Sequence, residues 1–257
     1  MADQNISKLF SETLLGGYDD DAPWTAVHAL RRIGSREVFE FAVKRCNSSD
    51  PIIRARGVDV LAQLGKTAEH PTHSFPEETY SLIAGLLERE RDVRALRSEI
   101  SALGHLENPL AIPLITKYRT HPSADVRFAV AFALGSFPND PRSVGSLLSL
   151  VDDSDKDVRD WATFGIGSLG DIDSPEIREA LFRRLSDTHD DVRQEAMAGL
   201  GKRGDRRVLP SLIKTLDSPP VSNCVIEAAY LMLGMDADRE DWDPEDYVAA
   251  LRTRFDE

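Results

Sequence analysis

The sequence has little cysteine and no long apolar stretch. Its 257 residues include only Cys46 and Cys224, and residues 1–17 lack the pattern of a secretory signal. We therefore expect two free thiols in a reducing compartment. The longest purely apolar runs are a few residues, whereas a membrane-spanning helix needs about 20. We expect a cytoplasmic protein that has no membrane segment.

Basic residues are also scarce. The chain has 31 Lys and Arg against 44 Asp and Glu, which gives a formal net charge of −13. A surface this acidic repels phosphate backbones, so we expect no generic nucleic-acid binding, and a protein partner would be basic. Residues 235–257 hold nine acidic and three basic residues, and we interpret this stretch as an acidic C-terminal cap.

The chain lacks the motifs of common catalytic and metal sites. It has no His-Glu-x-x-His motif and no Gly-rich phosphate loop, and its six histidines do not cluster as metal ligands do. Residues 152–157 begin like a calcium loop, but Val158 and Phe164 occupy the positions that require a glycine and a carboxylate. We expect no catalytic residue, no cofactor and no metal.

What the sequence does contain is a repeat. Segments that open near an aspartate and end in an apolar residue plus glycine recur at about 32-residue intervals. They are residues 20–34, 50–65, 91–104, 124–135, 157–170, 190–201 and 219–234. The register position is held in turn by Ala22, Ile53, Ala95, Val126, Val158, Val192 and Val221. Apolar or small residues stand at offsets 0, 4, 7 and 8 from it, which is one helical face. An aspartate suits the N-cap and the closing glycine a C-cap.

A second set of helices lies between these segments, and several open with a proline suited to the first turn. They are expected at about 4–15, 36–46, 76–90, 109–121, 141–153, 175–187 and 207–218, with a last helix at 243–257. Residues 66–79 show no helical period and are expected to form an insertion loop. No stretch alternates as a strand does, so we expect no sheet. The helix pairs must stack to bury their apolar faces, which predicts one domain over 1–257.

The repeat resembles a known family. The pattern D-x-D-V-R-x-x-A at 155–162, its relatives at 125–127 and 190–196, and the connector at 140–142 and 205–207 are similar to HEAT repeats of the short, bacterial, phycobilisome-lyase-like type. The resemblance implies an all-α fold, an α-α superhelix or HEAT-like solenoid of about seven helical hairpins plus a C-terminal capping helix. It also implies that Asp157 is a helix cap.

The resemblance further implies that the arginines of the motif bond aspartates or carbonyls in the turns. The residues assigned to this structural role are Arg54, Arg94, Arg127, Asp157, Arg159, Asp191 and Arg193. In HEAT solenoids the second helix of each pair lines the concave groove. Offsets 2, 5–6 and 9 point away from the core, and they indicate a groove lined by Trp24, Phe128, Phe132, Asp160, Trp161, Phe164, Glu195, Glu227 and Tyr230. Further flanking residues are His28, Arg31, Arg56 and Asp59.

An aromatic cluster ringed by charges is typical of a protein-binding hot spot, although rings of this kind also pack between helices. The leading hypothesis is a non-enzymatic, monomeric module that binds another protein in the groove, with the acidic residues suited to a basic partner. One alternative is a phycobilin-lyase-like chromophore chaperone or enzyme, and another is an acidic, immunity-type protein that neutralises a basic toxin. The iron-dependent deoxyhypusine hydroxylases are excluded, because no histidine here is followed by glutamate.

Overall fold

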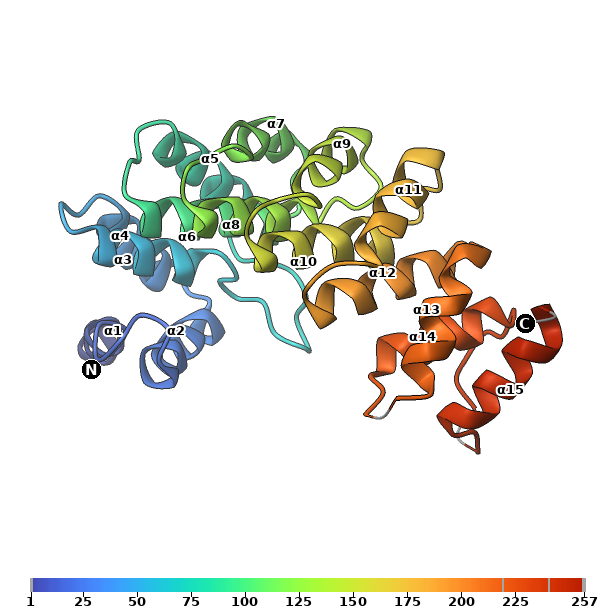
Figure 1. Cartoon of the computed structure of the whole chain (residues 1–257). Helices are drawn as coiled ribbons and strands as arrows, with labels where there is room; N and C mark the ends of the chain where they lie inside the picture. Colours follow the sequence, from blue (N-terminus) through green and yellow to red (C-terminus); the bar gives the residue numbers. More distant parts are fainter. Residues whose placement is uncertain (1, 219, 240, 256–257) are drawn as a thin grey trace. The chain divides into compact units, whose positions relative to one another are not determined.

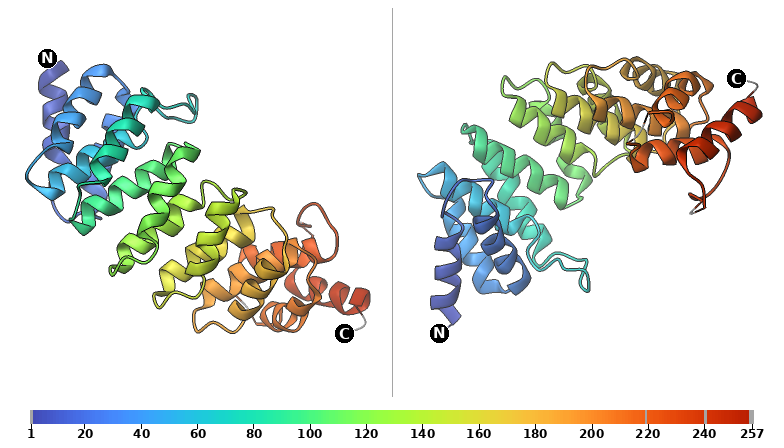
Figure 2. Two further views of the ribbon diagram at one scale, coloured as in Figure 1. Left: turned by 90° about the horizontal axis from the view of Figure 1, so that it is seen from above. Right: turned by 60° about the horizontal axis from the view of Figure 1, so that its bottom comes forward.

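The computed structural model describes residues 2–218, 220–239 and 241–255, and within these ranges it contains helices and no strand. The protein divides into two compact units, Met1–Phe137 and Pro138–Glu257. Each unit is built from helical hairpins in two layers (Figures 1 and 2). No helix in the described ranges is long and apolar enough to cross a membrane. The single continuous domain that the repeat indicates stays a prediction.

Unit 1 contains four helical hairpins. Its helices are α1 (Ala2–Glu12), α2 (Asp21–Ile33), α3 (Arg36–Cys46), α4 (Pro51–Leu61), α5 (Pro76–Leu87), α6 (Val93–His105), α7 (Ile112–Ile115) and α8 (Ala124–Leu134). The second helices α2, α4, α6 and α8 pack on one another in that order, and each also packs against the first helix of its own hairpin. We call the row of α2, α4, α6 and α8 the second-helix layer, and the row of α1, α3, α5 and α7 the first-helix layer.

Unit 2 repeats this arrangement. Its helices are α9 (Pro141–Leu150), α10 (Lys156–Phe164), the π-helix η3 (Gly165–Leu169), α11 (Pro175–Arg184), α12 (Asp190–Lys202), the 3-10 turn η4 (Arg206–Val208), α13 (Leu209–Leu216), α14 (Asn223–Met232) and α15 (Pro244–Phe255). Its second-helix layer is α10, α12 and α14, backed by α9, α11 and α13. The last helix, α15, packs against both α13 and α14, which matches the predicted C-terminal cap.

Aspartates begin several of these helices. Asp50, Asp92, Asp140 and Asp155 each accept hydrogen bonds from backbone N–H groups in the first turn of the helix that follows. These N–H groups have no partner within the helix, so the caps stabilise its start. The cap of α10 is therefore Asp155, and the prediction that Asp157 caps this helix is wrong.

Three predicted boundaries differ from the structure. The helix expected at 109–121 is a one-turn helix, α7, flanked by the 3-10 turns Pro109–Ala111 and Thr116–Tyr118. The insertion loop ends at Phe75, because Pro76 begins α5. Val221 lies before α14, and the buried residue in its register is Val225. Proline explains the first two differences, since it lacks an N–H group and fits best in a first turn.

Two of the closing glycines are not C-caps but points of close contact between helices. Gly104 lies inside α6 and Gly201 inside α12. A Cβ atom on Gly104 would lie 2.6 Å from the Cα of Ala133, and one on Gly201 would lie 2.7 Å from the Cα of Ala228. Glycine at these positions lets consecutive second helices pack backbone to backbone.

We expect Gly104→Ala and Gly201→Ala each to lower the free energy of unfolding by about 1–3 kcal/mol, because the added methyl forces the helices apart. Urea denaturation followed by circular dichroism measures this. Gly145→Ala in α9 is the matched control, since a Cβ there meets no atom within 4 Å. It should raise stability by about 0.5–1 kcal/mol. Equal effects at all three positions would refute the packing role.

Candidate protein-binding surface

Three α10 residues outside the repeated motif, Asp160, Trp161 and Phe164, lie on the second-helix layer of unit 2. Trp161 and Phe164 are half-buried, and their rings meet edge to face with centroids 5.6 Å apart. Asp160 is half-buried beside them, and its buried Oδ1 atom has no hydrogen-bond partner in the described structure. Burial raises the pKa of Asp160, the nearby charges of Asp191 and Asp157 raise it further, and the charge of Lys156 opposes the shift.

Carboxylates from the next two second helices face the same region. The half-buried Glu195 of α12 accepts a 2.9 Å hydrogen bond from the Ser168 hydroxyl at its Oε2. Burial raises the pKa of Glu195; this hydrogen bond opposes the shift, and the charges of Asp160, Glu227 and Asp191 reinforce it. Acidic side chains of α10 and α14 therefore act on Glu195 of α12 across the layer.

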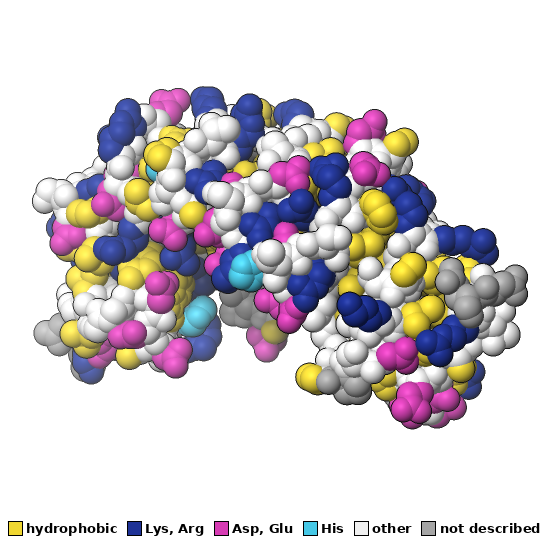
Figure 3. Space-filling model, in the orientation of Figure 1, with side chains coloured by type: hydrophobic (Ala, Val, Ile, Leu, Met, Phe, Trp, Pro, Cys, Tyr) yellow, Lys and Arg dark blue, Asp and Glu magenta, His cyan; other side chains and the backbone are white. Residues whose placement is uncertain are grey.

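These carboxylates lack cationic partners. Within the described residues, Asp160, Glu195 and Glu227 form no ion pair. Unit 2 has 15 Lys and Arg against 26 Asp and Glu, a formal charge of −11, whereas unit 1 has 16 against 18. Both signs are intermixed on the face of each unit that Figure 3 shows. Most of the acidic excess therefore belongs to the unit that carries the unpaired carboxylates.

Tyr230 of α14 adds a third aromatic side chain to this layer. It is half-buried, and burial raises the pKa of its hydroxyl, with Glu227 and Asp238 adding to the effect. With Tyr230, six of the nine predicted groove residues belong to unit 2, and they come from its three consecutive second helices. The other five are Asp160, Trp161, Phe164, Glu195 and Glu227.

The remaining three predicted groove residues belong to unit 1. Phe128 and Phe132 are half-buried on α8, and the Phe132 ring meets His105 edge to face at 5.3 Å. Trp24 is half-buried on α2, where its ring lies edge to face with Tyr18 at 6.3 Å. The ring of Trp24 is thus partly covered by the loop between α1 and α2.

That loop covers residues that the sequence predicts to flank an open groove. Tyr18 donates a 2.6 Å hydrogen bond to the Asp59 carboxylate of α4 and lies 2.8 Å from the Ser98 hydroxyl of α6. Arg56 donates to the backbone carbonyl of Tyr18 and to Asp59, and Arg31 donates two hydrogen bonds to the carbonyl of Asp59. Both arginines and Asp59 are buried, so their expected exposure on a groove is wrong.

The arginines of the motif connect neighbouring hairpins. Arg159 donates to both carboxylate oxygens of Asp187, at 2.8 and 3.0 Å, and to the carbonyls of Asp153 and Ser154. Burial acts to raise the pKa of Asp187, but the Arg159 hydrogen bonds, the His189 N–H and the charge of Arg184 hold it at about 2. Arg54 makes the same arrangement with Glu90 and with the carbonyls of Ser48 and Ser49 in the turn after α3.

Arg127 and Arg193 also donate to carbonyls of the preceding turn, those of His121 and Asp187. Arg94 differs: it is exposed, and its guanidinium lies 5.4 Å from the ring centroid of Tyr18. The reason is register, because Arg94 lies two residues after the N-cap Asp92, whereas Arg159 lies four residues after the N-cap Asp155. Asp191, like Asp157, lies in the first turn of its helix.

Both cysteines are free. Among the described residues, no three His, Cys, Asp or Glu side chains lie together as a metal ion would require. The arrangement on α10, α12 and α14 offers negative charge and aromatic surface, which is the chemistry of binding a cationic group.

Comparison with known proteins identifies the family. The HEAT repeats profile matches residues 80–167 and 164–234, which is more than half of the sequence. Protein YibA of Escherichia coli K12 is 30% identical over 213 residues, covering 80% of this chain and 73% of YibA. This protein belongs to the HEAT-repeat family. The predicted resemblance is thereby confirmed.

Other relatives of this HEAT-repeat protein include a lyase subunit. Phycocyanobilin lyase subunit alpha of Thermosynechococcus vestitus is 28% identical over 165 residues, covering 64% of this chain and 59% of the subunit. The crystal structure of Escherichia coli YibA matches with a TM-score of 0.72 at 22% identity, over 98% of this chain and 95% of YibA. The complex of CpcE and CpcF of phycocyanin lyase from Nostoc matches with a TM-score of 0.50 at 15% identity, over 90% of this chain and 94% of the other chain. The predicted all-α, HEAT-like fold is confirmed.

Proposed function

We propose that this HEAT-repeat protein is a non-enzymatic, monomeric interaction module of the cytoplasm, and that the second-helix layer of unit 2 binds a basic segment of another protein. The observation that supports this is the set of carboxylates on α10, α12 and α14 that lack cationic partners. Asp160, Glu195 and Glu227 stand there beside the Trp161–Phe164 pair. Trp24, Phe128 and Phe132 remain candidate contacts within unit 1.

Arginine is the side chain that suits this surface best. Its guanidinium can pair with two carboxylate oxygens at once and can stack on an aromatic face. Because the charges of Asp160 and Glu227 raise the pKa of Glu195, a bound cation relieves this repulsion as well as pairing with the carboxylates. The half-buried rings of Trp161 and Tyr230 supply apolar contact area. An arginine-rich, extended segment is therefore the proposed ligand.

We expect a fluorescein-labelled arginine-serine peptide to bind, with an affinity that falls as salt rises. The triple variant Asp160→Asn, Glu195→Gln, Glu227→Gln should weaken binding about 30-fold, because each ion pair to the half-buried Asp160 and Glu195 or to the exposed Glu227 contributes up to about 1 kcal/mol. Fluorescence anisotropy titrations measure both effects. The variant should remain folded, since it removes repulsion from the layer.

The control for this triple variant changes the net charge equally at other places. Glu176, Asp236 and Glu245 are exposed in unit 2 and form no ion pair within the described residues. Neutralising these three should change affinity less than about threefold. If the two triple variants weaken binding equally, the peptide responds to net charge alone and the proposed surface is wrong.

The similarity to a phycocyanobilin lyase subunit supports the second candidate, a lyase-like role on a chromophore. A bilin bound by this protein would give the purified material visible absorbance. The immunity-type role is a narrower form of the first proposal, with a basic toxin as the partner. Inhibition of one specific basic nuclease or toxin would distinguish it from a general scaffold.

A further inference from the structure

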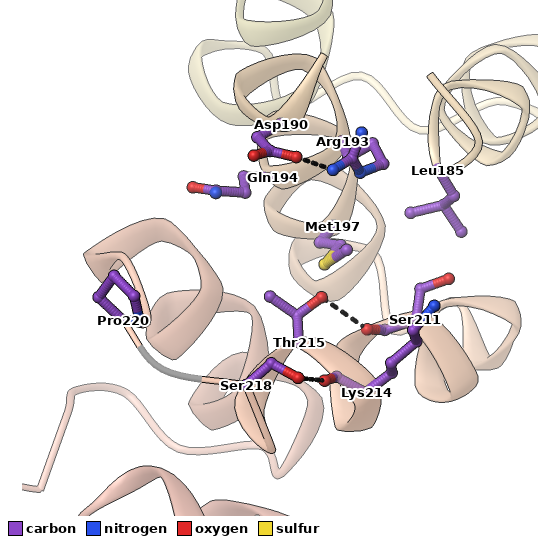
Figure 4. Close-up of a pocket in the computed structure, with 10 residues that line it drawn as sticks. All are labelled: Leu185, Asp190, Arg193, Gln194, Met197, Ser211, Lys214, Thr215, Ser218 and Pro220. Carbon is purple, nitrogen blue, oxygen red and sulfur yellow. Dashed lines mark hydrogen bonds and ion pairs between the residues drawn. The ribbon is translucent and has the colours of Figure 1, made fainter. Parts of the chain in front are cut away.

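A cavity of about 500 Å³ lies in unit 2 between the α11–α12 and α13–α14 hairpins (Figure 4). The turn η4 packs on α12, but α13 then packs on α14 and α15, which leaves a space beside the N-terminal half of α12. Its volume lies in the range of pockets that hold small organic ligands. None of the aromatic or unpaired acidic residues of the proposed binding surface lines it.

The cavity is lined mostly by polar residues, among them two cationic side chains, and one side of it is apolar. Met197 of α12 and Leu185 at the end of α11 are buried and supply this apolar wall. Arg193 lies on the α12 side and Lys214 on the α13 side (Figure 4). Asp190 is the one acidic residue among those that line the cavity.

The hydrogen bonds show which of these charges is available. Asp190 pairs with Arg193, and Arg193 also donates a 2.7 Å hydrogen bond to the carbonyl of Asp187. Lys214 is exposed, and its ammonium group has no ion pair or hydrogen bond in the described part of the protein. The cavity therefore has one unused positive charge beside an apolar wall, in a unit whose formal charge is −11.

Two hydroxyl groups that line the cavity already donate their hydrogens to backbone carbonyls. Thr215 donates its hydroxyl hydrogen to the carbonyl of Ser211, at 2.9 Å, and Ser218 donates its hydrogen to the carbonyl of Lys214, at 3.0 Å. The donors of Thr215 and Ser218 are thus used within α13 and the turn that follows it. Lys214 is the cation left to pair with an anion.

We infer that this cavity binds an organic carboxylate that carries a short apolar tail. The carboxylate pairs with the Lys214 ammonium, and the tail packs on Met197 and Leu185. Such a group exists in two forms, a free aliphatic acid or the C-terminal residue of a peptide. This inference goes beyond the proposed function and uses different residues, so either can fail alone.

Ligand-observed NMR with hexanoate as the probe tests the inference on the full-length protein. Hexanoate should bind at least tenfold more tightly than hexylamine or hexanol, which have the same aliphatic tail and no negative charge. Lys214→Gln should weaken hexanoate binding about tenfold, which corresponds to about 1.4 kcal/mol. Lys156→Gln is the control, because Lys156 is exposed in the same unit but does not line the cavity; it should leave binding unchanged.

A tripeptide ending in leucine, compared with its C-terminal amide, distinguishes the two sources. Tighter binding of the acid peptide than of hexanoate assigns the cavity to a peptide C-terminus, and the reverse order assigns it to a small acid. Either order supports the carboxylate chemistry. No binding of hexanoate or of the acid peptide at about 10 mM, or binding that Lys214→Gln does not change, would overturn it.

Discussion

Arg203→Ala is expected to lower the free energy of unfolding by about 3–5 kcal/mol, one of the largest single effects in the molecule. The Arg203 side chain is only 3% exposed, and it satisfies backbone carbonyls where the π-helix η3 ends. It donates hydrogen bonds of 2.7–3.3 Å to the carbonyls of Ile166, Gly167, Gly170, Ile172 and Gly199. Without the guanidinium, several buried carbonyls lose their partner.

Urea denaturation measures this loss of stability. Two further variants show whether it comes from the buried guanidinium. Arg203→Lys should recover less than half of the stability, because an ammonium group cannot reach carbonyls on both sides as a planar guanidinium does. Arg183→Ala is the matched control, since Arg183 is exposed and pairs with Asp152 at 3.0 Å. It should cost no more than about 1 kcal/mol. A small effect of Arg203→Ala would mean that water replaces its hydrogen bonds.

Glu99→Gln is expected to change how stability depends on pH. Glu99 is fully buried in α6, and neither of its carboxylate oxygens has a hydrogen-bond partner within the described residues. Burial raises its pKa to about 8, and the charge of Glu90 adds to the shift, while Arg54 and Arg89 oppose it. The folded protein therefore holds a proton on Glu99 at neutral pH, which the unfolded protein releases.

The sign follows from this difference in proton binding. The stability contributed by protonated Glu99 is complete below about pH 4.5 and is lost as the pH rises through about 8. Glutamine cannot ionise, so the free energy of unfolding of Glu99→Gln does not fall in this way. Relative to the wild type, it should rise by about 2–4 kcal/mol between pH 5 and pH 8.5. Urea denaturation at a series of pH values measures this gain. For the control Glu88→Gln, at an exposed position, the plot of unfolding free energy against pH should run parallel to that of the wild type. A parallel plot for Glu99→Gln would contradict the raised pKa of Glu99.

The fold was largely predictable because every repeat obeys the same physics. The apolar spacing at offsets 0, 4, 7 and 8 sets the buried face, and the helix at 36–46 has the predicted bounds. Glu99 shows the limit of such reasoning: it stands at offset 4 from Ala95, where an apolar side chain is expected, and pattern alone gives no sign of a carboxyl there. Gly104 and Gly201 resemble C-caps in sequence, and only the neighbouring helix reveals their role.

The candidate surface was predictable only where helices form it. Asp160, Glu195 and Glu227 come together because repeats place consecutive second helices side by side. Tyr18 lies in a loop of no fixed period, so the sequence did not indicate that it covers Asp59 and its neighbours. Arg203 lies outside the repeated D-V-R motif, and its many hydrogen bonds go to carbonyls at and after the π-helix, which the sequence did not predict.

The most direct test is to locate the bound arginine-serine peptide on the protein. Benzoylphenylalanine, a photo-crosslinking residue, is placed at Tyr230 in the second-helix layer of unit 2 or at Phe182, which is 38% exposed on α11 in the first-helix layer. Crosslinks should form at position 230 and be abolished by the triple neutralisation of Asp160, Glu195 and Glu227. Crosslinks at position 182 alone, or equally at both positions, would contradict the proposed surface.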